Sequence, residues 1–306
     1  MKMTSLSLIK LSALLLLAIL ASAPAQAQLP TPIKPGTAKT INIMPVGDSI
    51  TDGYDGTPNF GGYRYRLAQE LLDVSGGANY PVFNFNFVGS LSDNSSALGS
   101  NASHDGFGGY TVEPLPLAIF YGPFHGIYVP TLTAADPVNI IARDMAAYKP
   151  DVVLILLGTN NVGTAGQNPD LTHAGGFEAQ GNFYTPATLP NRSAIGDYSA
   201  LLTQIFQINP KVGVLVGGVP HQDPGGNVTP TNDANVTVFN NDLIKQVALL
   251  KRLGYNIGYV AGTALPWSST TFIDSVHPLQ PGFDKMADAW YTALTGLTPP
   301  PTPATP

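Results

Sequence analysis

The sequence predicts an α/β protein, a three-layer α/β/α sandwich around a five-stranded parallel sheet. Short apolar runs alternate along the chain with segments of helical periodicity, which is the pattern of successive βαβ units. Two runs, 152–157 and 212–216, are continuously apolar, as strands covered on both faces are. The chain has no cysteine, so an apolar core and not a disulfide framework has to stabilise this fold.

The five strands are expected at 40–46, 82–88, 151–157, 212–219 and 256–261. In the second of them, phenylalanines alternate with asparagines, a period of two that indicates one buried face and one wetter face. That strand is therefore expected at an edge of the sheet.

Helices are expected between the strands. Apolar residues recur at helical spacing over 63–72 and 239–250, and over a last segment that starts at Pro281 and stops near Gly296. Weaker helical patterns cover 135–148 and 194–208. With helices on both faces of a parallel sheet, the site is expected outside the carboxyl ends of the strands.

The N-terminus has the pattern of an export signal. Lysines flank an apolar run over 11–20, which is shorter than the ~20 residues that a membrane-spanning helix needs. Small residues at Ala25 and Ala27 suit a cleavage site. Residues 1–27 are therefore expected to be a signal peptide cut before Gln28, not a membrane anchor, and the mature protein to be extracellular or periplasmic.

The rest of the chain divides by composition. A Pro-rich lead-in over 28–39 precedes one domain over 40–297, and a Pro-rich tail follows over 298–306. The formal charge of −6 becomes −8 once the signal peptide is removed, since that segment carries two lysines and no acid. Nucleic acid and anionic membrane both require a positive face, so neither is expected as a partner.

Residues suited to acyl transfer follow the predicted strands. Ser49 lies directly after the first, in V-G-D-S-I-T-D-G, and Asp274 and His277 lie three residues apart in the loop before the last helix. A hydroxyl nucleophile needs an imidazole to take its proton and a carboxylate to fix the imidazole tautomer. These three residues are predicted to supply that set.

Acyl transfer also needs donors for the developing oxyanion. The Ser49 N–H, a glycine amide of the 106–109 loop and the Asn160 side chain are the candidates. Within the loop, Gly109 and Gly106 both remain open as the donor.

Four blocks of the chain, G-D-S-I-T-D-G, H-D-G-F-G-G-Y-T-V, L-G-T-N-N and D-S-V-H-P, resemble in order and spacing the SGNH (GDSL-type) hydrolase superfamily. The resemblance implies a flavodoxin-like sandwich with Ser49 as nucleophile, Asp274 and His277 as acid and base, and Gly109 and Asn160 completing the oxyanion hole.

Further blocks, G-G-Y-R at 61–64, F-V-G-S at 87–90 and the closing D-S-V-H-P-L-Q-P-G-F-D-K-M-A, look like the acetylxylan-esterase-like carbohydrate esterases. Two features depart from the family pattern. Asn161 stands where the family usually has Asp, and 162–193 form a long polar segment that is expected to rim the site.

The residues predicted to contact substrate are Asp48, Tyr54, Arg64, Tyr110, Asn161 and His221. Aromatic rings beside polar groups suit sugar rings, which offer apolar C–H faces and hydroxyls. Aromatic residues crowd the loops at this end of the sheet: Tyr54, Phe60, Tyr110, Phe120, Tyr121, Phe124 and Tyr128. The histidines lack metal-ligand spacing and no dinucleotide or P-loop motif occurs, so no metal and no cofactor is expected.

The sequence thus predicts a secreted serine esterase that removes a short acyl group, above all acetyl, from a polysaccharide such as xylan. A lipolytic or aryl esterase on the same triad is the first alternative. A non-catalytic carbohydrate-binding protein on the same fold is the second, because a fold by itself does not fix a function.

Overall fold

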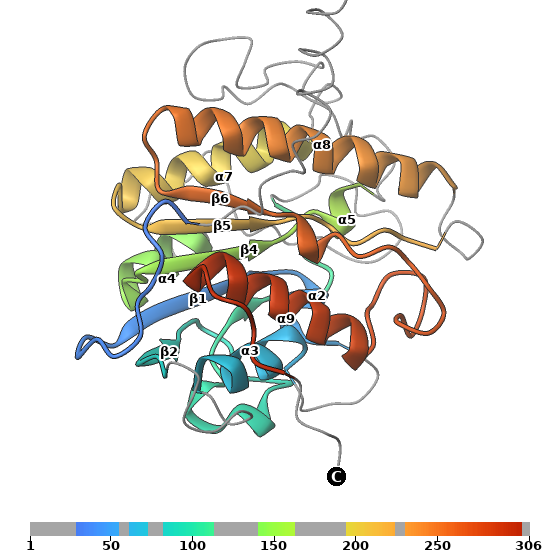
Figure 1. Cartoon of the computed structure of the whole chain (residues 1–306). Coiled ribbons are helices and arrows are strands. Elements are labelled where there is room, and N and C mark those ends of the chain that lie inside the picture. Colours follow the sequence, from blue (N-terminus) through green and yellow to red (C-terminus); the bar gives the residue numbers. More distant parts are fainter. Residues whose placement is uncertain are drawn as a thin grey trace, which may run out of the picture.

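A parallel sheet runs through the centre of the molecule (Figure 1). The computed structural model describes residues 29–54, 61–72, 82–112, 140–162, 194–223 and 230–301. Within them the strands lie in the order β2 (Phe85–Phe87), β1 (Ile41–Gly47), β4 (Val152–Leu156), β5 (Gly213–Gly217), β6 (Ile257–Val260), and every pairing is parallel. A further strand, β3 (Asp105–Gly106), pairs with the end of β1. The predicted flavodoxin-like parallel sheet is therefore confirmed, with the two-residue β3 as a sixth strand beside the five expected.

Helices cover both faces of the sheet (Figure 1). One face carries α3 (Tyr63–Leu72) and α9 (Gln280–Thr295), and the other carries α4 (Ile140–Tyr148), α7 (Ala194–Ile208) and α8 (Pro230–Arg252). The short helices α2 (Ser49–Asp52) and α5 (Thr159–Val162) begin just after β1 and β4, and the 3₁₀ turns cover Ser96–Asn101 and Ala261–Thr263. The three-layer sandwich is confirmed.

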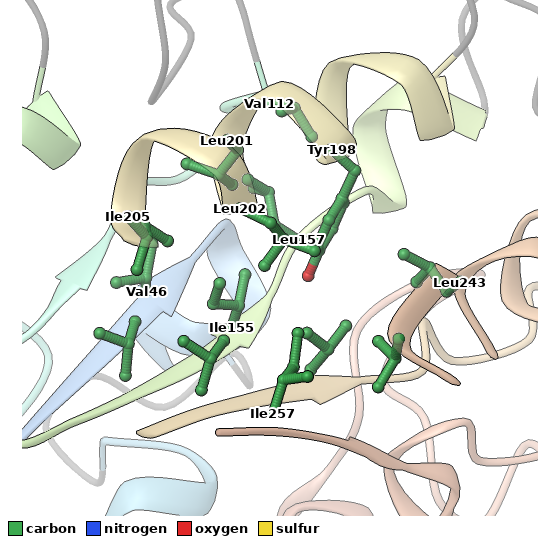
Figure 2. Close-up of a cluster of buried hydrophobic side chains, with 14 of the residues drawn as sticks. Val46, Val112, Ile155, Leu157, Tyr198, Leu201, Leu202, Ile205, Leu243 and Ile257 are labelled. Carbon is green, nitrogen blue, oxygen red and sulfur yellow. The ribbon is translucent and has the colours of Figure 1, made fainter. Parts of the chain in front are cut away.

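The sheet separates two apolar cores. In β4, Val153 and Ile155 face the helices α4, α7 and α8, whereas Leu154 faces α3 and α9. Figure 2 shows the first of these cores, where Ile155 lies among side chains of β1, β6 and α7. All five residues of β4 are buried, which explains why this strand is apolar at every position.

Most predicted elements lie within two residues of their predicted bounds. The helix over 63–72 and that over 194–208 match, while α8 starts well before the predicted residue 239. The second strand is shorter than 82–88. It begins at Phe85, because its first ladder partner in β1 is Ile41, and the ladder ends at the pair Ile43–Phe87. The N-terminal part of the helix predicted over 135–148 lies outside the described residues.

The two ends of the described chain pack onto α3 and α9. Leu29 is buried in the core, and its N–H donates to the Ala293 carbonyl at 3.1 Å. On the other side, Arg66 Nη2 donates to the Pro300 carbonyl at 2.7 Å. The predicted boundaries at 40 and 297 therefore leave out residues that pack as part of the domain.

Two predictions fall largely or wholly on residues that the structure does not describe, namely the signal peptide over 1–27 and the polar segment over 162–193. Among the helices that it does describe, none combines the length and the apolar character needed to cross a membrane.

Candidate active site

The turn after β1 places Ser49 at the carboxyl edge of the sheet. Gly47 has to be a glycine, since a Cβ there would lie 2.2 Å from the Leu156 carbonyl oxygen and from Thr51 Oγ1. Asp48 caps α2 by accepting the Ile50 N–H at 3.1 Å, and Ser49 opens that helix. The block G-D-S-I-T-D-G thus forms a strand end, a cap and one helical turn.

Ser49, His277 and Asp274 form a continuous chain of hydrogen bonds. Ser49 Oγ lies 2.8 Å from His277 Nε2, and His277 Nδ1 lies 2.8 Å from Asp274 Oδ2. The other carboxylate oxygen of Asp274 accepts the N–H groups of Val276 and His277, both at 2.7 Å. The structure therefore brings the three predicted residues together, and their catalytic roles stay a prediction.

The loop that carries Asp274 and His277 is fastened by contacts on several sides. Within it, the Ile273 N–H donates to the His277 carbonyl at 2.9 Å. From outside, Trp267 Nε1 donates to the Asp274 carbonyl at 3.1 Å, and the Asp223 N–H donates to the Ser275 carbonyl at 2.9 Å. Trp267 was not among the predicted site residues, because no sequence motif links it to the triad.

The two acids of the site differ in their electrostatics. Burial by itself raises the pKa of Asp274, but hydrogen bonds from the main chain and ring of His277 and from the Val276 N–H outweigh it and lower that pKa below its usual value. Burial raises the pKa of Asp48 to about 6, against the lowering effect of its hydrogen bonds and of nearby His277. Asp274 is the acid held in its ionised form, as an orienting carboxylate has to be.

Two of the predicted oxyanion donors, Asn160 and Gly109, have local geometry that the structure defines. Asn160 Nδ2 donates one hydrogen to the Tyr110 carbonyl at 2.8 Å, which fixes the plane of the side-chain amide and hence the direction of its second N–H. Gly109 has φ +76°, a conformation that favours glycine. The Gly106 N–H donates to His104 Nδ1 at 3.1 Å, so it already has a partner, and Gly109 stays the predicted donor.

Three of the six predicted substrate contacts lie at exposed or partly exposed positions. The Tyr54 ring meets the His277 ring edge to face, with centroids 4.8 Å apart, and is 50% exposed. The ring of Tyr110 stacks on Phe107, with centroids 4.8 Å apart. His221 is partly exposed on the neighbouring loop, where Nδ1 lies 2.9 Å from Asp233 Oδ1.

The other three predicted substrate contacts, Asp48, Arg64 and Asn161, are fully buried. The Arg64 guanidinium donates to the carbonyls of Thr51, Asp52 and Ala102 at 2.9–3.0 Å and to Ser95 Oγ at 2.7 Å. Asn161 Oδ1 accepts the Val112 N–H at 3.1 Å. These contacts correct the prediction, because the three side chains hold the loops of the site and have no exposed surface for a sugar.

Of the predicted aromatic residues, Phe60, Phe120, Tyr121, Phe124 and Tyr128 lie outside the described residues.

One group of ligand-type side chains in the described residues, Asp52, Asp93 and His104, has its ligand atoms within 4.8 Å of one another. Because His104 Nδ1 accepts the Gly106 N–H, the ring hydrogen sits on Nε2, which lies 3.1 Å from the Asp93 carbonyl. Burial and the charge of Arg64 lower the pKa of His104 to about 3. The group is therefore arranged as a hydrogen-bond network around a neutral imidazole.

Comparison with known proteins places this chain in a family. The GDSL-like lipase/acylhydrolase family matches residues 46–285. The chain is 28% identical over 266 residues to a multidomain esterase of Ruminococcus flavefaciens, a match that covers 85% of this chain and 29% of that protein. The chain thus spans less than a third of that relative's length.

The fold is similar to solved esterases. A family 3 carbohydrate esterase of Clostridium thermocellum superimposes with a TM-score of 0.54 at 23% identity, over 83% of this chain and 95% of that one. An acetyl esterase variant with acetate ion superimposes with a TM-score of 0.55 at 21% identity, over 83% and 96%. With its family match extending from the end of β1 into α9, the chain belongs to the GDSL-like lipase/acylhydrolase family.

Proposed function

We propose that this chain is a secreted serine esterase that removes acetyl groups from a polysaccharide such as xylan. The observation that carries the catalytic part is the chain of hydrogen bonds from Ser49 through His277 to Asp274, with 2.8 Å at both steps between side chains. It is the geometry of an activated hydroxyl nucleophile with an oriented base.

In the proposed mechanism, His277 Nε2 takes the proton of Ser49 as its Oγ attacks the ester carbonyl. The Ser49 and Gly109 N–H groups and the Asn160 amide hold the oxyanion of the tetrahedral intermediate. His277 then gives the proton to the leaving alcohol, and an acetyl ester stays on Ser49. Water, deprotonated by the same imidazole, attacks this ester and releases acetate, with the proton returning to Ser49.

Two lines of support favour a carbohydrate ester. The relatives named above include a carbohydrate esterase and an acetyl esterase that holds acetate. In this chain, the exposed ring of Tyr54 lies against His277, the residue that protonates the leaving alcohol. A sugar in the leaving position can thus place its apolar C–H groups against the ring of Tyr54. Export rests on the signal peptide predicted over 1–27.

Acetate release from acetylated xylan tests this proposal, with p-nitrophenyl esters of increasing acyl length measured in parallel. Wild type is expected to release acetate and to prefer acetyl. Ser49→Ala is expected to lose ~10³-fold or more in kcat/KM. Ser199→Ala is a matched control, because Ser199 is a buried serine of α7 whose Oγ donates to the Ile195 carbonyl and accepts from Gln246 Nε2.

Each other outcome selects an alternative. A preference for long acyl chains assigns the protein to the lipolytic esterases. Turnover of esters that Ser49→Ala leaves intact contradicts the proposed nucleophile. Absence of turnover on every ester, together with binding of xylan, favours the non-catalytic carbohydrate-binding protein.

A further inference from the structure

A small pocket lies behind the loop that carries Asp274 and His277. It has a volume of about 100 Å³ and is lined by Leu265, Pro266, Trp267, Ser268, Thr271 and Lys285. It includes none of the triad or oxyanion residues, yet it is next to them. The Trp267 indole lines the pocket and donates its N–H to the Asp274 carbonyl at 3.1 Å. A molecule held in this pocket thus lies one side chain away from the catalytic loop.

The pocket combines an aromatic ring, hydroxyl groups and a cation. Ser268 Oγ lies 2.8 Å from Thr271 Oγ1 and 3.0 Å from Thr270 Oγ1, so its wall carries a small network of hydroxyls that can donate or accept. The indole N–H is committed to Asp274, which fixes the orientation of the Trp267 ring. An oriented ring beside hydroxyls suits a pyranose, whose C–H groups contact the ring while its own hydroxyls meet the network.

The ammonium group of Lys285 favours a negatively charged ligand in this pocket. Among the residues that the structure describes, no carboxylate forms an ion pair with Lys285, although the sequence has 20 acids and only 14 lysines and arginines. The acids nearest to Lys285 have other partners. Asp288, three residues further along α9, shares a side-chain hydrogen bond with Glu70. Asp284 Oδ1 accepts from Gln280 Nε2 at 2.7 Å, and the Asp274 carboxylate is turned to His277. An ammonium without a carboxylate partner, at the wall of a pocket in an acidic protein, favours an anionic ligand.

We propose that the pocket formed by Trp267, Ser268, Thr271 and Lys285 is a second binding site, which holds a carboxylate-bearing sugar of the polymer that the esterase acts on. That the ligand is part of a polymer rests on the proposed function. That it is a sugar acid rests on the residues of the pocket alone. Such a site favours polysaccharides in which a uronic acid lies near the esterified sugar. Such a contact acts on the affinity for the polymer and not on the chemistry at Ser49.

Tryptophan fluorescence tests binding directly, because the protein has two tryptophans and only one of them lines the pocket. Trp290 is fully buried in the core between α9 and the sheet, so a change in emission or in quenching by acrylamide reports on Trp267. The probes are methyl glucuronoside, methyl glucoside and acetate, the last as a carboxylate without a sugar ring. The Trp267→Phe variant verifies the source of the signal.

Methyl glucuronoside is expected to give a saturable signal, with about fivefold weaker binding of methyl glucoside and no signal from acetate at the same concentration. Lys285→Met is expected to weaken methyl glucuronoside binding about fivefold and to remove the preference over methyl glucoside. Lys251→Met, at an exposed lysine near the end of α8, is the matched control and is expected to bind like wild type. Equal binding of the two glycosides, equal binding by Lys285→Met, or a signal from acetate overturns the proposal.

A second measurement links the pocket to catalysis. The ratio of kcat/KM for acetylated oligosaccharides with and without a uronic acid is expected to fall about fivefold in Lys285→Met, through KM. A ratio that Lys285→Met leaves unchanged contradicts a role in substrate choice. Binding of methyl glucuronoside by a protein that shows no Ser49-dependent turnover sinks the esterase proposal but not the pocket, so the two failures are distinguishable.

Discussion

The carboxylate of Asp274 contacts its own loop and the His277 imidazole with different oxygens. Oδ1 accepts the main-chain N–H groups of Val276 and His277, and Oδ2 lies 2.8 Å from His277 Nδ1. One oxygen thus fixes the shape of the loop, while the other fixes the tautomer of the ring that faces Ser49.

Asp274→Asn separates these two functions. Its oxygen can still accept the two main-chain N–H groups, but its amide then faces Nδ1 as a donor and favours the tautomer with the hydrogen on Nε2. This imidazole cannot take the Ser49 proton, so kcat/KM on p-nitrophenyl acetate is expected to fall ~10⁴-fold, with a nearly unchanged Tm.

Asp151→Asn is the matched control, because it makes the same chemical change at the opposite end of the sheet, where Asp151 pairs with Lys39. It is expected to keep full activity. Comparable activities of Asp274→Asn and Asp151→Asn would show that Asp274 does not set the tautomer.

Asp48 predicts a pH dependence of stability. Its pKa is about 6 in the folded protein against an ordinary value of 3.8, because the carboxyl is fully buried. The folded state therefore binds more protons between these two values, and the contribution of Asp48 to stability falls as pH rises from about 4 to about 6. Asp48→Asn keeps an oxygen for the Ile50 N–H and does not titrate, so its stability relative to wild type is expected to rise by up to ~3 kcal/mol between pH 4 and pH 7.

Urea unfolding over this pH range measures the difference. The comparison with wild type is needed because other buried acids also have raised pKa values. Burial and the neighbouring Asp144, for example, raise the pKa of Asp105 to about 7. Asp151→Asn serves again as the comparison at a partly exposed carboxylate. A stability difference between Asp48→Asn and wild type that stays flat with pH contradicts a titrating Asp48.

The position of the site followed from the sequence because parallel topology determines it. Ser49 and His277 are 228 residues apart, yet each follows a strand whose carboxyl end faces the same edge of the sheet. Buried polar contacts could not be predicted in the same way. Three of the four partners of Arg64 are main-chain carbonyls, at 51–52 and at 102, and such partners leave no trace in residue identity.

The short strand β3 and the packing of Leu29 were not predicted from the sequence, for a related reason. A strand of two residues such as β3 is too short to show a period of two. The segment before residue 40 is rich in proline, which indicates a linker, although its one leucine at position 29 packs in the core. Composition describes a whole segment, whereas packing is decided by single side chains.

Leu29→Ala tests whether this leucine belongs to the core. The side chain is 2% exposed and packs with the core of α3 and α9, so its truncation is expected to destabilise a chain that starts at Gln28 by ~2–5 kcal/mol. Leu253→Ala is the matched control at a leucine that is 60% exposed, with an expected change within about 0.5 kcal/mol. Urea unfolding measures both, and equal stabilities of the two variants would mean that Leu29 adds nothing to the fold.

Asn160 separates transition-state stabilisation from substrate binding. Its side-chain amide is held in plane by a hydrogen bond to the Tyr110 carbonyl at 2.8 Å, and its second N–H is the proposed oxyanion donor. Asn160→Ala removes one donor and is expected to lower kcat ~10²–10³-fold with little change in KM, because the interaction forms only in the transition state. Asn160→Asp keeps the size of the side chain but replaces the donor by a negative charge, so it is expected to be no more active than Asn160→Ala.

Asn209→Ala is the control. Asn209 lies at the turn before β5, where it accepts the Lys211 N–H at 3.1 Å, and this variant is expected to keep wild-type kcat. Steady-state kinetics on p-nitrophenyl acetate decide the matter, and a rise in KM at constant kcat in Asn160→Ala would assign Asn160 to substrate binding instead.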